Sequence, residues 1–320
     1  MSCVGVPNKS SLLAAPDRWS EDRSKIRQWK MDRWNTAHWL ADAAVCALID
    51  EANLTPKPAL VDSRGPGAHC DMNLDLLHRS AKSLRSMFEA IAFWAFEADA
   101  TISLREDLGE LGRRGERVMM QATAGVNTHR GAIWTLGLLC AATAMLQSNK
   151  RAAGSICAQA GVIAALPDSR SVILPTHGQR VVQKYGVCGA RGEALDGFRH
   201  IAQRGLPTLK NNRLRGVPED QAQLDALMAI MAELDDTCLL HRGGMPALTL
   251  AKQGARTMLA LGGVSSLGGF RALQELDREL LELKTSPGGA ADLLAGVLFL
   301  DSVERKFVDE VGGADGNTGV

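Results

Sequence analysis

The sequence has few aromatic residues and little that is typical of β-strands. Phe, Trp and Tyr make up 4% of its 320 residues, and Tyr occurs once. Val and Ile rarely alternate with polar residues, and the best strand-like run, residues 171–174, is too short to found a sheet. No repeat of fixed period is evident. These absences argue against a fold built on sheets or on repeats and predict an all-α protein.

The sequence also lacks a net charge. Its 36 basic residues balance 36 acidic ones, which argues against a protein that binds nucleic acid or anionic membranes through bulk charge. Any anion-binding site must therefore be local. Hydrophobic residues make up 46% and charged residues 22% of the chain, so it can bury a full core and is not disordered.

The cysteines show no disulfide framework. None of the seven forms a CxxC pair, and no cleavable signal sequence is recognisable at the start of the chain. We therefore expect reduced thiols in a cytoplasmic protein. The cysteines are Cys3, Cys46, Cys70, Cys140, Cys157, Cys188 and Cys238.

One uncharged stretch has the outline of a membrane hairpin. Residues 131–149 carry no charge, and after Lys150 and Arg151 the uncharged run resumes to Pro167. Polar residues such as Thr135 and Gln159 dilute it, and the second run is too short to span a bilayer. We expect two buried core helices here.

Helical periodicity extends through most of the chain. It predicts a single large multi-helix domain whose active site is built from inter-helix loops, with two intimate helical lobes as the alternative. We expect a polar N-terminal extension over 1–35, the helical domain over 36–311 and a flexible tail over 312–320. The expected helices cover 36–53, 73–98, 104–123, 131–148, 151–166, 177–184, 193–203, 219–240, 246–261, 267–283 and 290–309.

The first junction rich in chemistry lies between residues 54 and 72. Two prolines around Lys57 fix the backbone and keep the lysine out of any helix. Asp62, His69 and Asp71 are residue types that bind metals or transfer protons. A purely structural explanation is that Asp71 caps the following helix and that His69 lies in a turn.

The second junction combines a glycine-bracketed His-Arg pair with polar capping residues. Asn127, His129 and Arg130 precede the helix expected from Gly131. Backbone N–H groups at a helix start, beside His129 and Arg130, are typical of an anion site. An N-cap with an incidental histidine is the alternative explanation.

The third junction has three glycines at every third position, including Gly189. Lys184 and Arg191 flank them, Glu193 follows, and such glycines allow phosphates to approach the backbone closely. The pattern is neither a Walker loop nor a Rossmann fingerprint, since the required lysine ending and the preceding strand are both missing.

The fourth and fifth junctions add carboxylates and further basic groups. Asp236, His241 and Arg242 precede a glycine pair that is expected to end a helix; an amphipathic helix end with dipole-compensating His and Arg explains them equally well. The fifth junction, residues 286–294, has the chemistry of a plain turn leading into a helix.

Taken together, these junctions resemble the ATP:dephospho-coenzyme A triphosphoribosyltransferase family. The resemblance covers the chain from about Trp39 to Leu300, and one departure is Ala59, where the family usually has glycine. Six motifs in order carry it: Thr55-Pro-Lys-Pro with Leu60-Val-Asp62, Gly67-Ala-His-Cys-Asp-Met72, Gly125-Val-Asn-Thr-His-Arg-Gly131, Tyr185-Gly186 with Gly189-Ala-Arg-Gly-Glu193, Asp236-Thr237 with Leu240-His-Arg-Gly-Gly244, and Ser286-Pro-Gly-Gly with Ala291-Asp-Leu-Leu294.

The resemblance implies a glycosyl transfer. The 5-triphosphoribosyl group of ATP passes to the 2′-hydroxyl of 3′-dephospho-coenzyme A and adenine leaves, which gives the prosthetic-group precursor of malonate decarboxylase or citrate lyase. A single-function length favours the malonate decarboxylase branch. ATP and 3′-dephospho-coenzyme A are then the partners, nucleic acid and membrane are not, and a homodimer is allowed.

The resemblance also implies roles for the junction residues. The phosphates require local cations and Mg²⁺, an oxocarbenium-like state requires carboxylates, and the two proton transfers require an acid and a base. The candidates for catalysis are Asp62, His69, Asp71, Glu193, Asp236 and His241; for binding the substrates, Lys57, Asn127, His129, Arg130, Lys184, Gly189, Arg191 and Arg242; and for the metal, Asp62, Asp71 and Asp236.

Two other function classes stay open on the residues alone. A Mg²⁺-dependent nucleotide or ADP-ribosyl hydrolase on an all-helical fold would also use acidic helix starts and glycine-rich loops. A non-catalytic helical interaction protein would tolerate the loss of His129 or Arg191. Adenine release that requires both substrates discriminates the transferase from both alternatives.

Overall fold

The computed structural model describes residues 18–171 and 177–312, and within them the chain is all-α, with one isolated β-bridge between Asp62 and Gly65. The prediction of the fold class is confirmed. The helices are α1 (Arg18–Asn53), α2 (Leu74–Ser83), α3 (Arg85–Ala95), α4 (Ile102–Ala122), α5 (Arg130–Met145), α6 (Ala153–Ala165), α7 (His177–Tyr185), α8 (Gly189–Leu195), α9 (Leu206–Leu214), α10 (Glu219–Met231), α11 (Thr237–Ala260), α12 (Leu267–Glu282) and α13 (Gly288–Gly312), with a 3-10 turn η1 (Ser148–Lys150) and a π-helical turn η2 (Ile201–Gly205).

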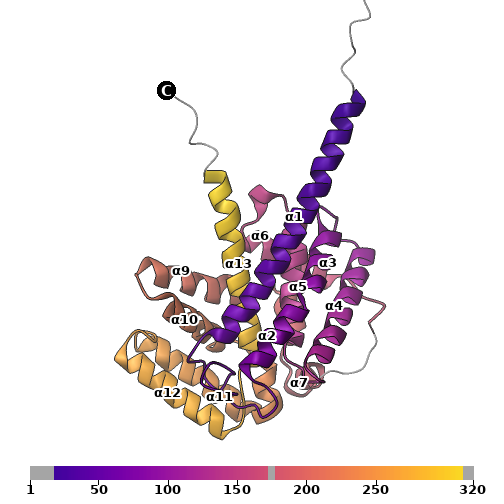
Figure 1. Ribbon diagram of the computed structural model, residues 1–320. Coiled ribbons are helices and arrows are strands. Elements are labelled where there is room, and N and C mark those ends of the chain that lie inside the picture. The colour runs from indigo at the N-terminus through magenta and orange to yellow at the C-terminus, as the bar shows by residue number, and fades with distance from the viewer. Residues whose placement is uncertain (1–17, 172–176, 313–320) are drawn as a thin grey trace, which may run out of the picture.

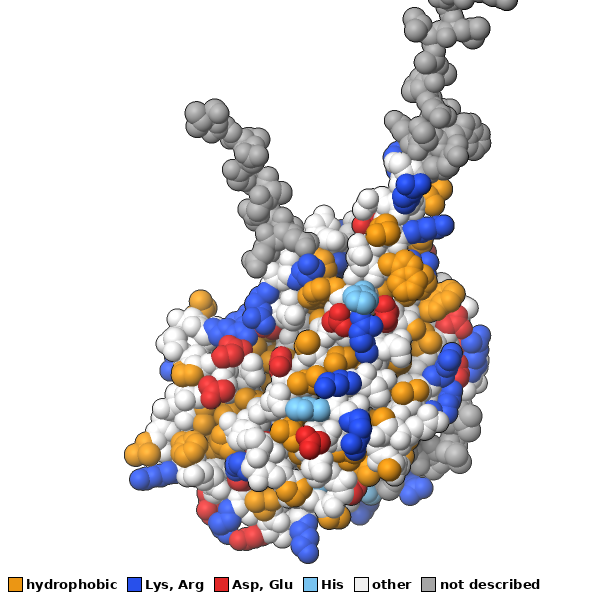
Figure 2. Space-filling model, viewed as in Figure 1, with side chains coloured by type: hydrophobic (Ala, Val, Ile, Leu, Met, Phe, Trp, Pro, Cys, Tyr) orange, Lys and Arg blue, Asp and Glu red, His pale blue; other side chains and the backbone are white. Residues whose placement is uncertain are grey.

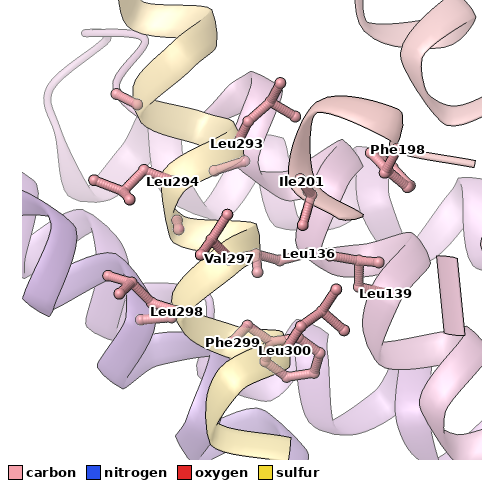
Figure 3. Packing of buried hydrophobic residues seen from close by; sticks show 14 of the residues in the cluster. Leu136, Leu139, Phe198, Ile201, Leu293, Leu294, Val297, Leu298, Phe299 and Leu300 are labelled. Atoms are coloured by element: carbon pink, nitrogen blue, oxygen red, sulfur yellow. The ribbon is translucent and has the colours of Figure 1, made fainter. Parts of the chain in front are cut away.

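The core forms where α13 crosses α5. Leu294, Val297 and Phe299 of α13 are fully buried, and they lie against Leu136 of α5 and Ile201 of η2 (Figure 3). Both α5 and the middle of α13 are apolar around most of their circumference, which is typical of helices enclosed on all sides. The two helices are therefore the rigid frame on which the other helices pack.

The first helix is longer than the sequence indicated. It begins at Arg18 instead of Thr36, and its first half projects from the body of the molecule (Figure 1). Trp29 packs edge-on against Phe96 at 5.9 Å, and its indole N–H donates to Glu97 at 2.7 Å. Large hydrophobic side chains remain exposed along this projection, while acidic and basic side chains are interspersed over the rest of this face (Figure 2). The division of the chain at residue 36 stays a prediction.

The uncharged stretch forms α5 and α6, as expected for core helices. Twelve of the sixteen residues of α5 are buried, and α6 packs beside it. Within the described residues, no helix is long and apolar enough to cross a membrane.

Several helices differ from the sequence-based expectation. The glycine pair 243–244 does not end a helix, since α11 continues to Ala260 across a kink at Gly244. The helix expected over 73–98 divides at Leu84 into α2 and α3, and the one expected over 219–240 divides after Met231, because Asp236 caps a new helix. Helix α9 was not expected, since Gly205 and Pro207 are typical helix breakers. Pro207 lies in the first turn of α9, where the missing N–H costs nothing.

Candidate active site

Four of the five junctions meet at one end of the bundle. There the loop that follows α1 reaches the N-terminal ends of α5, α11 and α13 (Figure 1). His69 of that loop contacts Ser286, Asp236 before α11 contacts Ala290, and Asp292 of α13 contacts Gly131 of α5. Helix N-termini carry partial positive charge and N–H groups without intrahelical partners, so this end of the bundle favours anionic groups.

Asp236 connects two of these helix starts. Its Oδ1 accepts hydrogen bonds from the N–H groups of Cys238 at 2.8 Å and Leu239 at 3.4 Å, and its Oδ2 accepts one from Ala290 at 2.9 Å. The side chain is buried, and burial raises its pKa although the amide donors oppose that effect. Asp236 is therefore the N-cap of α11 and a clamp on α13.

Asp292 lies in the first turns of α13, directly against the start of α5. A Cβ added to Gly131 would lie 1.9 Å from Asp292 Oδ2, so this approach requires glycine. Burial together with Glu51 and Asp236 raises the pKa of Asp292 well above its ordinary value, while the N–H of Ala132 opposes the shift. Three carboxyl groups thus share one region, and Asp292 alone of the three is partly exposed.

His69, Ser286 and Arg242 form a polar triad at the mouth of this region. His69 Nε2 lies 2.9 Å from Ser286 Oγ, and both terminal nitrogens of Arg242 lie 3.3 Å from His69 Nδ1. Burial, and next the positive charge of Arg242, lower the pKa of His69 to about 4, whereas Asp71 raises it. His69 is therefore a neutral imidazole near pH 7, and Arg242 provides the positive charge.

Lys57 does not extend into solvent. Its side chain is 1% exposed, and Nζ donates to both the carboxylate and the backbone carbonyl of Glu51 at 2.6 Å. The two prolines hold it in the loop as expected, but they direct it inward, onto the end of α1. The direct contact of Lys57 with phosphate stays a prediction.

Asp62 organises the same loop. It accepts hydrogen bonds from the N–H of Lys57 at 2.9 Å and from the backbone and guanidinium of Arg64, and Arg64 also pairs with Asp277 of α12 at 2.7 Å. Both carboxylate oxygens are thus already engaged. This arrangement indicates a structural role for Asp62, and its predicted catalytic role gains no support from the geometry.

Ala59 occupies the position at which the resembling family has glycine. Its φ is 54°, in the left-handed region that favours glycine, and the residue is fully buried. Its N–H donates to Asp277 Oδ1 at 2.7 Å. Ala59 therefore adopts a left-handed backbone conformation that glycine would adopt at lower cost.

His129 is enclosed beneath the start of α5. Its Nδ1 lies 2.7 Å from Ser80 Oγ, which also contacts Thr128 at 2.6 Å, while Nε2 is buried without a hydrogen-bond partner. Burial, with a smaller effect from Lys57, lowers its pKa to about 4. The imidazole is therefore neutral near pH 7, and its buried Nε2 leaves hydrogen-bonding capacity unused.

The remaining candidates lie nearer the surface or in other contacts. Arg130 pairs with Glu116 at 3.0 Å, and Glu193 pairs with His200 at 2.6 Å in a buried contact below α8. Asn73, not Asp71, caps α2 through a 2.8 Å bond to the N–H of Leu76, so the capping explanation for Asp71 is wrong. Asn127, Lys184, Arg191, His241 and Asp71 are exposed, and Gly189 has a φ of 61° and packs on Val182 and Thr237.

The structure adds residues that the sequence did not single out. Glu51, Ser80 and Ser286 contact the candidate residues directly, and Asp292 completes the carboxylate group. Asp292 lies in the fifth junction, which was interpreted as plain turn chemistry. The sequence did contain a signal for Asp292: it follows two glycines by a few residues at the start of a helix. Glycines at a helix start allow another chain segment to approach closely, and a carboxylate beside them can then contact that segment.

The predicted metal ligands are not gathered into one site. Asp62 and Asp236 use their oxygens for the hydrogen bonds described above, and Asp71 is exposed. Over residues 18–171 and 177–312, no three or more His, Cys, Asp or Glu side chains are grouped so that they could hold a metal ion. These residues therefore do not provide a preformed site for Mg²⁺.

Comparisons with known proteins agree over most of the chain. The family described as ATP:dephospho-CoA triphosphoribosyl transferase matches residues 37–311. A Klebsiella pneumoniae protein named 2-(5''-triphosphoribosyl)-3'-dephosphocoenzyme-A synthase is 54% identical over 265 residues, 83% of this chain and 94% of that protein. A Pseudomonas syringae protein with the same name, marked probable, is 51% identical over 278 residues. The matched region covers 87% of this chain and 95% of the Pseudomonas syringae protein. No solved structure matches the chain significantly.

Proposed function

Because the chain belongs to the ATP:dephospho-CoA triphosphoribosyl transferase family, we propose that it transfers the 5-triphosphoribosyl group of ATP to the 2′-hydroxyl of 3′-dephospho-coenzyme A. The chain is a transferase by this membership. The match over residues 37–311 is the observation that carries the proposal, because it includes all five junctions. A hydrolase or a non-catalytic interaction protein would give a different pattern of adenine release from the one expected of a transferase.

The reaction is a substitution at the anomeric carbon of the ATP ribose. The bond from C1′ to adenine N9 breaks, and a bond from C1′ to the acceptor oxygen forms. The proton of the acceptor hydroxyl goes to a base, adenine receives a proton from an acid, and the triphosphate stays on the ribose. The protein must therefore stabilise positive charge at the ribose and move two protons.

Asp292 is the best candidate for the acid that protonates adenine. A carboxyl group whose pKa is raised well above its usual value carries a proton to donate. Its partial exposure at the meeting of α5 and α13 allows contact with substrate. Asp236 and Glu51 are buried and hydrogen-bonded, which supports positioning roles for both, since their charges raise the pKa of Asp292.

The phosphates fit the basic mouth of the site. Arg242, with His69 and Ser286, offers a cation and polar hydrogens on the loop side, and the N-terminal ends of α5 and α13 face the same region. We assign the ATP triphosphate or the coenzyme pyrophosphate to this mouth. His129 is buried and burial lowers its pKa to about 4, so we assign it a positioning role at the start of α5.

Mg²⁺ is an expected companion of the ATP substrate. Among the described residues the three aspartates form no cluster that could hold it. Mg²⁺ commonly binds through substrate phosphates, several waters and only one or two carboxylates, so the proposal does not require a protein cage. Of the three predicted metal ligands, Asp71 is the one that is exposed, and its Oδ1 lies 3.9 Å from His69 Nδ1. It could therefore contact a Mg²⁺ ion that is bound to the substrate phosphates.

The pathway is a further part of the proposal. We propose that the product is the prosthetic-group precursor of malonate decarboxylase, with citrate lyase as the other candidate, and that the protein acts in the cytoplasm. Deleting the gene in its host and assaying both enzymes would decide between them. Loss of malonate decarboxylase activity alone is expected.

The decisive experiment is chromatographic detection of adenine. Purified protein is incubated with ATP and Mg²⁺, with and without 3′-dephospho-coenzyme A. Adenine should appear only when both substrates are present, together with a triphosphoribosylated coenzyme product. Adenine or phosphate released from ATP alone would indicate a hydrolase instead, and no release under any condition would contradict the proposed activity.

A further inference from the structure

A second group of basic side chains lies along α4, outside the region described above. Arg105 and Arg113 of α4 both approach one oxygen of Asp168, with Nη1 to Oδ2 distances of 3.4 and 2.8 Å. Gly109 lies between them, and a Cβ there would lie 2.2 Å from the same oxygen. The exposed Arg191 of α8 completes the group, which we call the α4 arginine cluster (Arg105, Arg113 and Arg191).

Hydrogen-bonding capacity in this cluster is left unused. Arg105 Nε and Arg113 Nη2 are buried and have no hydrogen-bond partner, and neither does Asp168 Oδ1. A buried donor without a partner destabilises a folded protein. Two such donors lie on neighbouring guanidinium groups, which is uncommon and calls for a reason.

Two carboxylates are shared among three arginines here. Asp168 pairs with both Arg105 and Arg113, and Glu110 is shared between Arg113 at 3.2 Å and Arg117 at 3.0 Å. Burial lowers the pKa of Arg105; Asp168 opposes this shift, and smaller repulsion from Arg113 and Arg191 adds to it. An added anion would relieve the repulsion between the guanidinium groups.

The cluster adjoins the candidate active site through α5 and α8. The guanidinium of Arg105 lies 5.3 Å from the ring centre of Trp134, whose indole N–H donates to the carbonyl of Ala190 at 3.1 Å. Gly189, two residues before Arg191, packs against Thr237, which directly follows Asp236. The cluster is therefore connected to the start of α11 through α5 and α8.

We propose that the α4 arginine cluster is an oligophosphate subsite of the active site, which binds the phosphate chain of one of the two substrates. This inference rests on the proposed function for its choice of ligand. Each substrate carries a phosphate chain, whereas the mouth formed by His69, Arg242 and Ser286 provides one anion-binding place. Guanidinium groups bind phosphate oxygens through paired hydrogen bonds, and the exposed Arg191 presents such a group to a ligand.

The test uses Arg113→Gln and Arg191→Gln, with Arg114→Gln as the control. Arg114 is exposed on the same helix and loses the same charge. Arg191 is exposed, so its variant tests the subsite without disturbing buried contacts. The readouts are the dissociation constant of inorganic pyrophosphate, by calorimetry, and the separate KM values for ATP and 3′-dephospho-coenzyme A.

Both cluster variants should weaken pyrophosphate binding about 10-fold or more, since one charge-assisted contact is worth about 1.5–3 kcal/mol, and Arg114→Gln should change it less than twofold. A raised KM for ATP assigns the cluster to the triphosphate, and a raised KM for the coenzyme assigns it to the pyrophosphate.

Unchanged pyrophosphate binding and unchanged KM values in both variants would overturn the inference. If the protein released no adenine, weaker pyrophosphate binding in the variants would still support an oligophosphate site, so the two failures are distinguishable.

Discussion

Asp236 and Ala290 are 54 positions apart in the chain, and the N–H of Ala290 donates to Asp236 Oδ2 at 2.9 Å. The same carboxylate caps α11 through Cys238. One side chain therefore fixes the relative position of two helix starts, and with them Arg242 on α11 and Asp292 on α13. The geometry of the proposed site depends on this clamp.

Replacing Asp236 should destabilise the protein as well as slow it. We expect Asp236→Ala to lower the free energy of unfolding by about 2–4 kcal/mol, because a cap is lost and a buried N–H loses its partner. Asp236→Asn keeps one oxygen and should lose about half as much, so it is the variant for assays of adenine release. Urea unfolding followed by circular dichroism measures the free energy of unfolding of both variants.

Asp235→Ala, at an exposed ion pair with Lys252, is the control and should change stability by less than about 1 kcal/mol. Equal stability of Asp236→Ala and the wild type would contradict the clamp.

A methyl group at position 131 should displace Asp292. On helix propensity alone, Gly131→Ala would stabilise α5 by up to about 1 kcal/mol. The added Cβ would instead lie 1.9 Å from Asp292 Oδ2, so one of the two segments must move. We expect a loss of stability and at least a 10-fold loss of adenine release, since small displacements of catalytic groups are costly. Gly154→Ala is the matched control, because its Cβ would meet nothing within 4 Å. Similar behaviour of the two variants would show that the contact has no role.

The enclosed His129 should make stability depend on pH. Its pKa is lowered from 6.5 to about 4 in the folded protein. Its contribution to stability is therefore complete above about pH 6.5 and is lost as the pH falls toward 4. In His129→Asn that contribution is absent. The difference in unfolding free energy between wild type and variant should shrink by about 2 kcal/mol from pH 7.5 to pH 5. A difference that does not change with pH would mean that the imidazole can be protonated in place.

The buried pair of Lys57 and Glu51 should behave as a unit. Lys57→Met leaves a buried carboxylate without its cation, which costs about 3–5 kcal/mol. The double variant Glu51→Gln with Lys57→Met removes both charges and should be more stable than Lys57→Met alone. Chemical unfolding of the two single variants and the double variant gives the coupling energy. Additive losses would show that the two groups do not depend on each other.

Much of this site could be expected from the sequence, and the rest depends on packing. The all-α fold followed from helical periodicity, and the junction residues His69, Asp236 and Arg242 do come together. The inward direction of Lys57 could not be predicted, because prolines fix the backbone but do not determine which side of the loop a side chain faces. The contact between Asp292 and Gly131 joins positions 161 apart, and only the crossing of α13 over α5 brings them together.

Asp292 provides the sharpest test of the chemistry. If it donates the proton to adenine, Asp292→Asn should lower the rate of adenine release about 100-fold or more, since general acids contribute roughly 10²–10⁴. The wild-type rate should fall as the pH rises above the pKa of Asp292, and this decline should be missing in the residual activity of the variant. Glu51→Gln removes a negative charge that raises this pKa, so it should shift the decline to lower pH. A purely structural role for Asp292 would lower the rate at every pH alike and would leave the decline where it was in both variants.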